Sequence, residues 1–440
     1  MRYVVLGASA AGVNGVRELR RHDPEAEIIL VSKDKDIYSR CILHHYLGGI
    51  RDKKGICFAE PDFEAKYRVN WYKGMSCTGL DAEAREIIIS GGYTGNGRET
   101  DGMQCAAGRE APVWGKFDGS IRIPYDRLLI AAGSRSSLPP VEGLREAGGV
   151  YGFHNLDEVE QIKARALSQE HIVVMGGGLT GVDAAMGFLH MGKKVELVEL
   201  ADRLLVKQLD KRSASTYEKA LEDQGIRLHL GTGISRVCCG PDGNVASIQL
   251  SDGQELPCTM LVVTAGVRPN VGFLEGTGLE LDRFGLVIDS HGRTNIPEIF
   301  GAGDVTGRSP IWPAAVKQAV AAAANMTGHS MAMDDFFASK STMNFLGIPT
   351  MSLGMPVRPD DTYCETVEDT GEQYRKIIHK QGRIYGAILQ GDLSYGGVLT
   401  QLIARRIDVS RVKKPLFRID YSDFFHEKDN FEFHYDEVTR

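Results

Sequence analysis

Three residues whose side chains could carry chemistry lie close together in the segment YSRCILHHYLGG, residues 38–49. Cys41 could act as a redox thiol, and His44 and His45 follow three and four residues later. If Ser39 caps a helix, Cys41 lies in its first turn, where unsatisfied backbone N–H groups lower a thiol pKa. A protonated His45 one turn further along the same face would lower that pKa again. A packing role for Cys41 stays open, and His44 is expected to be a packing or solvated histidine.

Two glycine-rich turns, at residues 7–12 and 176–181, belong to the elements that must position such chemistry. The first turn, GASAAG, follows the apolar run YVVLG and precedes a segment with helical spacing and the strand-like run AEIILVS. The second turn, GGGLTG, follows HIVVM and precedes a helical segment and the strand-like run KKVELVEL. A glycine turn between strand and helix lets the backbone approach a pyrophosphate, whose charge the helix N-terminus stabilises. The sequence therefore predicts two nucleotide-binding βαβ units.

The second turn carries the fuller signature. Gly176, Gly178 and Gly181 complete the pattern G-x-G-x-x-G, and Glu199 ends the following strand. A carboxylate there accepts hydrogen bonds from a ribose 2′-hydroxyl. We expect NADH rather than NADPH at this turn, because the carboxylate would repel a 2′-phosphate.

The first turn departs from that pattern at its middle position. Gly7 and Gly12 occupy the first and third glycine positions, and Ser9 occupies the second. Serine is small enough for a close approach, so a pyrophosphate site is still expected. The following strand ends in Ser32 and Lys33 before an aspartate, so the ribose contact stays open.

Composition narrows the class of protein. The chain has 440 residues, 42% of them hydrophobic, and a net charge of −7, which gives no reason to expect nucleic acid or an anionic membrane as a partner. Its apolar runs are too short to span a bilayer, and its start does not resemble a signal peptide. The eight cysteines form no C-x-x-C pattern, so we expect a reduced, cytoplasmic chain without a metal centre. The polar, glycine-rich stretch 90–120 is expected to be a long hairpin excursion or loop.

Several segments in a fixed order resemble the FAD-dependent pyridine-nucleotide oxidoreductases. The matching segments are the first glycine turn, LLIAAGSR (128–135), GGGLTG, TAGVRPN and GAGDV (301–305). The resemblance covers about residues 1–330 and implies an α/β fold of the glutathione-reductase type. It has two Rossmann-like dinucleotide-binding domains followed by an α+β cap. The expected segments are 1–150 (FAD, first part), 151–265 (NADH), 266–330 (FAD, second part) and 331–440 (cap).

The resemblance also assigns cofactor residues, and it implies that Asp304 contacts the ribityl–phosphate region of FAD. The residues assigned to FAD are Gly7, Ser9, Ala10, Ala11, Gly12, Ser32, Lys33, Arg40, Cys41, Ala132, Gly133, Gly303 and Asp304. The residues assigned to NADH are Gly176, Gly178, Leu179, Thr180, Gly181, Glu199 and Gly266.

The opening segment combines the patterns of two branches of this family. Cys41 and Tyr46 fit the single-cysteine branch, which includes NADH oxidases and coenzyme A disulfide reductases. Tyr38 and Arg40 fit the ferredoxin- and rubredoxin-reductase branch, in which a lysine stands at the position of His45. The absence of a C-x4-C pattern excludes disulfide reductases of the glutathione-reductase type.

Two further residues complete the catalytic hypothesis. The lysine of the reductase branch pairs with a glutamate, and Asp183 stands at the position of that glutamate. We therefore predict a pair between His45 and Asp183 beside the flavin, with Cys41 as the third catalytic candidate. Peroxidase-type members carry a histidine where this chain has Ala10, so peroxide reduction is disfavoured.

The expected function is an FAD-dependent oxidoreductase, a homodimer, that passes electrons from NADH to a redox partner protein or a small acceptor. One alternative is a thiol–disulfide reductase or NADH oxidase that uses Cys41. Another, from a different class, is a flavoprotein that senses NADH and has no catalytic role. The physiological acceptor is not indicated by any segment of the sequence.

Overall fold

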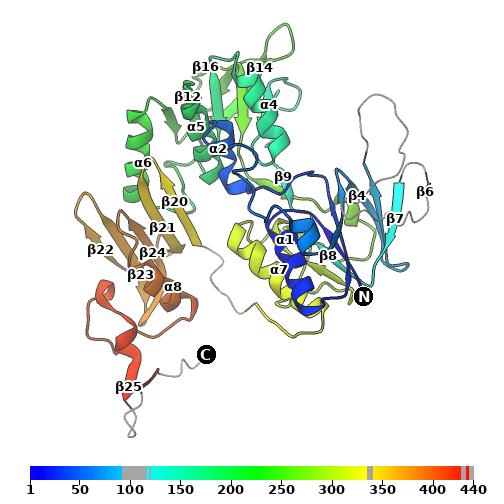
Figure 1. The fold of residues 1–440 in the computed structure, drawn as a ribbon. Coiled ribbons are helices and arrows are strands. Elements are labelled where there is room, and N and C mark those ends of the chain that lie inside the picture. Colours follow the sequence, from blue (N-terminus) through cyan, green and yellow to red (C-terminus); the bar gives the residue numbers. More distant parts are fainter. Residues whose placement is uncertain (92–115, 118–119, 334–339, 428–432, 436–440) are drawn as a thin grey trace. The chain divides into compact units, whose positions relative to one another are not determined.

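The chain forms two compact units, each built from several stretches of sequence (Figure 1). The computed structural model describes residues 1–91, 116–117, 120–333, 340–427 and 433–435, so most of the predicted loop 90–120 lies outside the described residues. Unit 1 comprises Met1–Ser137, His154–Glu160 and Gly266–Asp334, and unit 2 comprises Leu138–Phe153, Gln161–Ala265 and Asp335–Arg440.

Unit 1 is organised around a five-stranded parallel sheet with the strand order β19-β8-β1-β2-β3. Its strands are β1 (Arg2–Leu6), β2 (Glu27–Ser32), β3 (Val69–Lys73), β8 (Arg127–Ile130) and β19 (Ile299–Gly301). Helices α1 (Ala10–His22) and α7 (Trp312–Met326) pack against each other and share one hydrophobic cluster with the sheet. The alanines of α7 allow this close packing, because they add little side-chain volume between the two helices.

Smaller elements complete unit 1. They are an antiparallel sheet of order β4-β5-β7-β6, a two-stranded ribbon of β9 and β18, and short helices. Their bounds are β4 (Ser76–Asp81), β5 (Glu86–Ser90), β6 (Lys116–Phe117), β7 (Ser120–Pro124), β9 (Ser134–Ser136), β18 (Val267–Pro269), η1 (Arg40–Ile42), α2 (Leu43–Leu47), α3 (Phe63–Lys66), η2 (Gly272–Leu274) and η3 (Gly303–Thr306).

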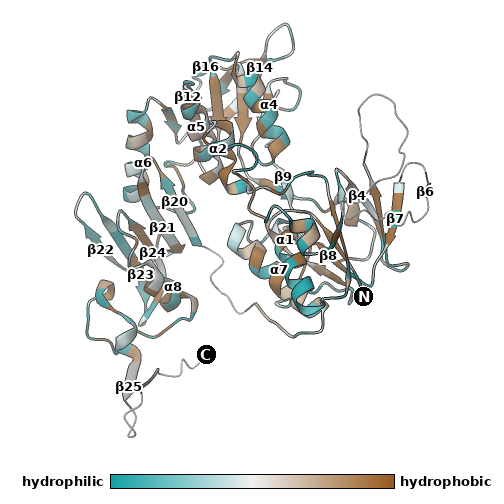
Figure 2. Cartoon of the chain, in the orientation of Figure 1, coloured by the Kyte–Doolittle hydropathy of each residue, from teal (hydrophilic) through white to brown (hydrophobic). Residues whose placement is uncertain are grey.

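Unit 2 contains a second parallel sheet, with the strand order β10-β17-β11-β12-β13, and a three-stranded antiparallel sheet. Figure 2 shows visible strands of these sheets in brown, and β11, β12 and β17 consist almost entirely of buried residues. The bounds are β10 (Val150–Gly152), β11 (Ile172–Met175), β12 (Val195–Glu199), β13 (Arg227–Leu230), β14 (Ile234–Cys239), β15 (Val245–Leu250), β16 (Glu255–Pro257), β17 (Met260–Val263), α5 (Leu179–His190) and α6 (Lys211–Asp223). Helix α4 (Leu156–Ala166) begins in unit 1 and ends in unit 2.

The C-terminal part of unit 2 is an antiparallel sheet of order β20-β21-β24-β23-β22. Its apolar cluster joins the sheet to α8 and to the chain that follows. The bounds are β20 (Lys340–Phe345), β21 (Ile348–Gly354), β22 (Cys364–Asp369), β23 (Tyr374–Lys380), β24 (Arg383–Gln390), α8 (Gly396–Ala404), η4 (Leu416–Arg418), η5 (Tyr421–Phe424), β25 (Phe425–Glu427) and β26 (Phe433–Tyr435).

The predicted α/β fold, with two dinucleotide-binding sheets and a C-terminal sheet, is confirmed. The predicted domain limits at residues 150, 265 and 330 stay predictions, because the division into two units leaves the second nucleotide-binding sheet and the cap together. In the part of the chain that the structure describes, no helix is both long and apolar enough to cross a membrane.

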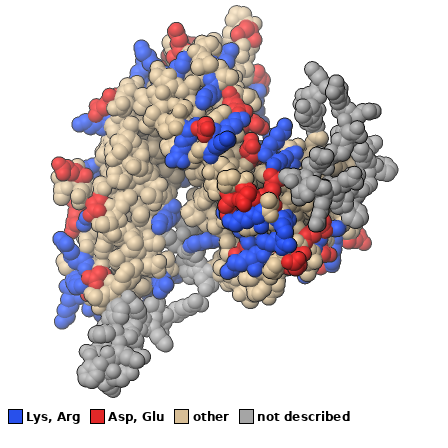
Figure 3. Space-filling model, viewed as in Figure 1, with Lys and Arg blue, Asp and Glu red and all other residues tan. Residues whose placement is uncertain are grey.

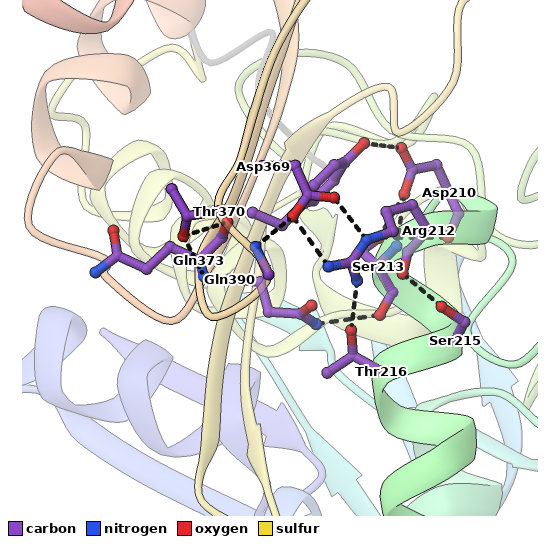
Figure 4. Close-up of polar contacts among 11 residues, drawn as sticks. Asp210, Arg212, Ser213, Ser215, Thr216, Asp369, Thr370, Gln373 and Gln390 are labelled. Atoms are coloured by element: carbon purple, nitrogen blue, oxygen red, sulfur yellow. Dashed lines mark hydrogen bonds and ion pairs between the residues drawn. The ribbon is translucent and has the colours of Figure 1, made fainter.

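A buried polar cluster fastens α6 to the C-terminal sheet within unit 2 (Figure 4). Asp210 caps α6 through the backbone N–H of Ser213 at 2.9 Å. Its carboxylate also accepts a hydrogen bond from the Tyr374 hydroxyl at 2.6 Å and pairs with the Lys376 ammonium at 3.1 Å. Burial alone would raise the pKa of Asp210, but these donors outweigh it and hold the pKa below its usual value.

A second, more exposed ion pair joins the same two elements. Arg212 of α6 donates to both carboxylate oxygens of Asp369, at 2.7 and 3.0 Å, and both side chains are about one-third exposed. An exposed pair of this kind contributes little to stability, because water screens both charges. The two pairs therefore allow a matched comparison of a buried and an exposed contact.

We expect Asp210→Asn to lower the free energy of unfolding by about 3 kcal/mol at pH 7, because it leaves the buried Lys376 ammonium without one of its carboxylates. The control Asp369→Asn should cost less than about 1 kcal/mol. Because the folded pKa of Asp210 is lowered, its contribution is present above the unfolded pKa of about 3.9 and is lost as the pH falls through the folded value. Urea unfolding at pH 7 and in acid measures both effects, and equal losses in the two variants would contradict the account.

Candidate functional site

The first glycine turn brings α1 unusually close to the end of β1. Gly7 has a φ of +111°, and a Cβ there would lie 2.2 Å from the Ala131 carbonyl oxygen. A Cβ at Gly12 would lie 1.7 Å from the Gly7 carbonyl oxygen, so only glycine fits either position. Ser9 precedes α1 as its N-cap residue, and Ala10 begins the helix. A glycine turn of this geometry before a helix is the arrangement in which backbone N–H groups can bind a pyrophosphate, and the FAD site at this turn stays a prediction.

The ends of β8 and β19 meet beside this turn. The Ser134 hydroxyl donates to Asp304 Oδ2 at 2.8 Å, and the Asn270 side chain donates to the Ala132 carbonyl at 2.9 Å. Gly303 has a φ of +81°, and its N–H donates to the Gln318 side chain of α7 at 2.7 Å. The predicted FAD residues Ala132, Gly303 and Asp304 are therefore held by hydrogen bonds or backbone geometry within unit 1. Gly133, next to Ala132, has a φ of +65°, with open space where its Cβ would be.

The end of β2 is occupied by internal hydrogen bonds. The Ser32 hydroxyl donates to the Asp34 carbonyl at 2.5 Å and accepts from the Trp71 indole at 2.8 Å. Lys33 is exposed. Arg40, predicted to contact FAD, pairs with the Asp34 carboxylate at 3.0 Å. The Asp34 carboxylate is thus already paired within unit 1, and the ribose contact of this site stays open.

The segment around Cys41 differs from the predicted helix start. Residues 40–42 form the 3₁₀ turn η1, and α2 covers only the five residues 43–47. Ser39 precedes η1 but makes no side-chain capping hydrogen bond, so the proposed cap is wrong. Cys41 is exposed, and the rings of His44 and His45 stand edge to face, 4.2 Å apart. Cys41 therefore does not lie in the first turn of a Ser39-capped α-helix, the setting that was expected to lower its thiol pKa.

The second glycine turn repeats the geometry of the first. Gly176 has a φ of +113°, and a Cβ at Gly181 would lie 1.8 Å from the Gly176 carbonyl oxygen. Gly178 caps α5, and nothing lies within 4 Å of its would-be Cβ. That open space at a helix N-terminus is where the backbone of this motif meets a pyrophosphate. Leu179 and Thr180 begin the helix.

Glu199, at the end of β12, points back onto this turn. Its carboxylate accepts hydrogen bonds from the Gly177 N–H at 2.5 Å and from the Ala201 N–H at 2.7 Å. These two donors fix the carboxylate next to the site where a ribose is predicted. Gly266, the last residue assigned to NADH, has a φ of +101° and lies at the first position of unit 1 after β17.

The predicted His45–Asp183 pair stays a prediction, because the two residues belong to different units. Asp183 lies on α5 and is partly buried, and the loss of hydration raises the pKa of its carboxyl to about 8. A raised pKa of this kind is common among groups that transfer protons, and the catalytic role of Asp183 stays a prediction.

Three polar residues that contact the predicted FAD residues or each other were not predicted from the sequence: Ser134, His154 and Gln318. Of these three, only His154 lies beside a local sequence signal, which is a capping box that marks the start of a helix. Asn155 and Glu158 form a reciprocal capping box at the start of α4, with bonds of 2.9 and 3.3 Å. The contacts of Ser134 and Gln318 depend on residues distant in the sequence.

Charges on the face drawn in Figure 3 are mixed over α1 and its neighbours. Arg17 pairs with Glu60 at 2.6 Å, Lys66 pairs with Glu60 at 2.9 Å, and Arg21 pairs with Glu18. Across the described ranges, no group of three or more histidine, cysteine or acidic side chains could hold a metal ion.

Comparison with known proteins agrees with this geometry. Residues 1–319 match the family described as pyridine nucleotide-disulphide oxidoreductase, and residues 340–407 match the rubredoxin NAD+ reductase C-terminal domain. Among solved structures, the NAD-dependent persulfide reductase from A. fulgidus has a TM-score of 0.78 at 23% identity, covering 92% of this chain and 77% of that one. The NADH:rubredoxin oxidoreductase from Clostridium acetobutylicum has a TM-score of 0.70 at 18% identity, covering 94% and 97%. At these identities the solved structures show the fold alone.

Curated relatives extend the comparison over more than nine-tenths of the chain. The NADH-dependent phenylglyoxylate dehydrogenase subunit epsilon of Aromatoleum evansii is 25% identical, with 94% of this chain and 93% of the relative covered. The nitrite reductase [NAD(P)H] of Bacillus subtilis is also 25% identical over 93% of this chain, but the chain spans only 48% of that relative's length. The two glycine turns and the family match over residues 1–319 lead to one conclusion: the chain belongs to the pyridine nucleotide-disulphide oxidoreductase family and is an oxidoreductase.

Proposed function

We propose that this oxidoreductase takes electrons from NADH and delivers them, by way of FAD, to a redox partner protein. The observation that carries the proposal is the combination of two matches in one chain. The first 319 residues match the oxidoreductase family, and residues 340–407 match the C-terminal domain of rubredoxin NAD+ reductase. The phenylglyoxylate dehydrogenase subunit, which the chain spans almost fully, is itself named as one subunit of an NADH-dependent enzyme.

The chain's own residues provide the binding and the orientation. The turn at Gly7 and Gly12 would hold the FAD pyrophosphate at the start of α1, and Asp304 would hold the ribityl side. The turn at Gly178 would hold the NADH pyrophosphate, with Glu199 on the adenosine ribose. FAD, when bound, supplies the hydride acceptor and the means to pass electrons on. The protein has to bring both cofactors together and to keep other oxidants away.

Cys41 is not required in this proposal. Its thiol is exposed on a 3₁₀ turn, without the helix N-terminus that would favour a thiolate. The thiol–disulfide alternative would need Cys41 as nucleophile, whereas delivery to a partner protein would not. The sensor alternative predicts slow turnover with every acceptor and an NADH-dependent change of oligomeric state, which light scattering would detect.

We expect Cys41→Ser to retain NADH turnover with rubredoxin as acceptor to within about twofold, because no bond to sulfur forms in the proposed reaction. Steady-state kinetics with the holoenzyme measure this, and Cys57→Ser, also an exposed cysteine of unit 1, is the control. A loss of about a hundredfold or more in Cys41→Ser alone would favour the thiol–disulfide alternative instead.

Gly178→Ala should raise the KM for NADH by about tenfold or more, because a methyl group would occupy the open space at the start of α5. The unfolding temperature should not change, since the methyl meets no protein atom. Gly397→Ala is the matched control, because it also adds a methyl to open space in the first turn of a helix of unit 2. Equal KM values in the two variants would contradict an NADH site at this turn.

Glu199→Gln should narrow the preference for NADH over NADPH by about tenfold, because the amide keeps an acceptor for Gly177 but no longer repels a 2′-phosphate. The measurement is the ratio of kcat/KM for the two nucleotides. Glu222→Gln, on an exposed position of α6, should leave the ratio unchanged. An unchanged ratio in Glu199→Gln would show that this carboxylate does not discriminate between NADH and NADPH.

A further inference from the structure

A line of polar side chains within unit 1 ends on Asp304. The buried Ser134 hydroxyl donates to Asp304 Oδ2 at 2.8 Å, and the Ser134 hydroxyl oxygen also lies 3.2 Å from His154 Nε2. These three residues come from the ends of three different segments of the chain, at positions 134, 154 and 304. None of them depends on unit 2 for these contacts.

The proton count assigns the direction of each bond. A serine hydroxyl has one proton, and an ionised carboxylate can only accept. Because the Ser134 proton goes to Asp304, the Ser134 oxygen has to accept from an N–H at His154 Nε2. Burial and the nearby charge of Arg40 lower the pKa of His154 to about 3, so the ring is neutral and carries a single N–H.

The His154 backbone is fixed on both sides. Its N–H donates to Glu158 at 2.7 Å, and its carbonyl accepts from the Arg40 guanidinium at 2.6 Å. Arg40 is in turn paired with Asp34 at 3.0 Å. Tyr38 accepts a hydrogen bond from the Leu156 N–H at 3.1 Å, which secures the same segment two residues later. The imidazole is therefore presented to Ser134 by a rigid frame.

We propose that His154 and Ser134 are positioning residues that orient the Asp304 carboxylate toward FAD. His154 holds the Ser134 hydroxyl with its proton toward Asp304, and Ser134 fixes one carboxylate oxygen. Among the described residues, no hydrogen bond engages the other oxygen, Oδ1, which is left to accept from hydroxyl groups of FAD. The inference rests on the proposed role of Asp304 at the FAD site.

The physical reason is preorganisation. A carboxylate without a fixed donor samples several rotamers, and binding has to select one of them. A donor that already holds one oxygen removes that cost before FAD arrives. The hydrogen bond from Ser134 to the Asp304 carboxylate is charge-assisted, which makes it stronger than a neutral one. Loss of this one donor should therefore weaken FAD binding measurably.

The test is the dissociation constant of FAD, measured by titrating the apoprotein and following flavin fluorescence. Ser134→Ala and His154→Met should each raise the constant about tenfold, equivalent to about 1.4 kcal/mol. His154→Gln should stay near the wild-type value, because its side-chain amide can supply an N–H at a similar reach. The double variant Ser134→Ala/His154→Met should bind FAD no more weakly than either single variant, since both act through one contact.

Two measurements separate positioning from a structural role. The unfolding temperature of the apoprotein is recorded for each variant, and His171→Met, an exposed histidine of unit 2, is the control. Unchanged FAD binding in both single variants, additive losses in the double variant, or equal losses in His154→Gln and His154→Met would overturn the inference. A wild-type apoprotein that fails to bind FAD would overturn the proposed function as well, whereas wild-type binding with unaffected variants would overturn the positioning role alone.

Discussion

The close approach of a helix to the glycine turn before it is the constraint on which the rest of this molecule depends. In both nucleotide-binding sheets, the third glycine of the turn lies so near the carbonyl of the first that a methyl group would overlap it. Gly12 and Gly7 meet in this way in unit 1, and Gly181 and Gly176 meet in unit 2. Because no side chain intervenes, the first N–H groups of α1 and α5 stand directly over the carboxyl ends of the strands. We propose that each sheet thereby offers an anion site, formed by the backbone before any specific side chain is considered.

Around these two sites the protein fixes its polar groups by contacts between distant segments. At the first predicted site, Asp304 accepts from Ser134, Ser134 contacts His154, and the His154 carbonyl accepts from Arg40, which pairs with Asp34. At the second, the Glu199 carboxylate is fixed by two backbone donors of its own unit. The two sites thus use the same backbone device but different means of orienting a carboxylate. Elsewhere in unit 2, the cluster at Asp210 joins helix α6 to the C-terminal sheet.

The elements predicted well are those whose signal is local. Glycine spacing and the strand–helix alternation predicted both nucleotide units, and the order of short motifs predicted the family. The contact of Ser134 with Asp304 joins residues 170 positions apart, and no local pattern announces it. The cap at Ser39 was wrong, because the chain there forms a 3₁₀ turn and the Ser39 side chain makes no capping hydrogen bond. The pairing of His45 with Asp183 stays a prediction, since its members belong to different units.

The central claim is that electrons enter at FAD from NADH and leave it without passing through a thiol. Anaerobic titration of the holoenzyme with NADH, followed by flavin absorption, tests this claim most directly. The account predicts that a single molecule of NADH per FAD completes the reduction, since FAD is the sole group that accepts the two electrons. A requirement for a second NADH before the flavin is fully reduced would show an additional redox centre at a cysteine. That result would contradict the account.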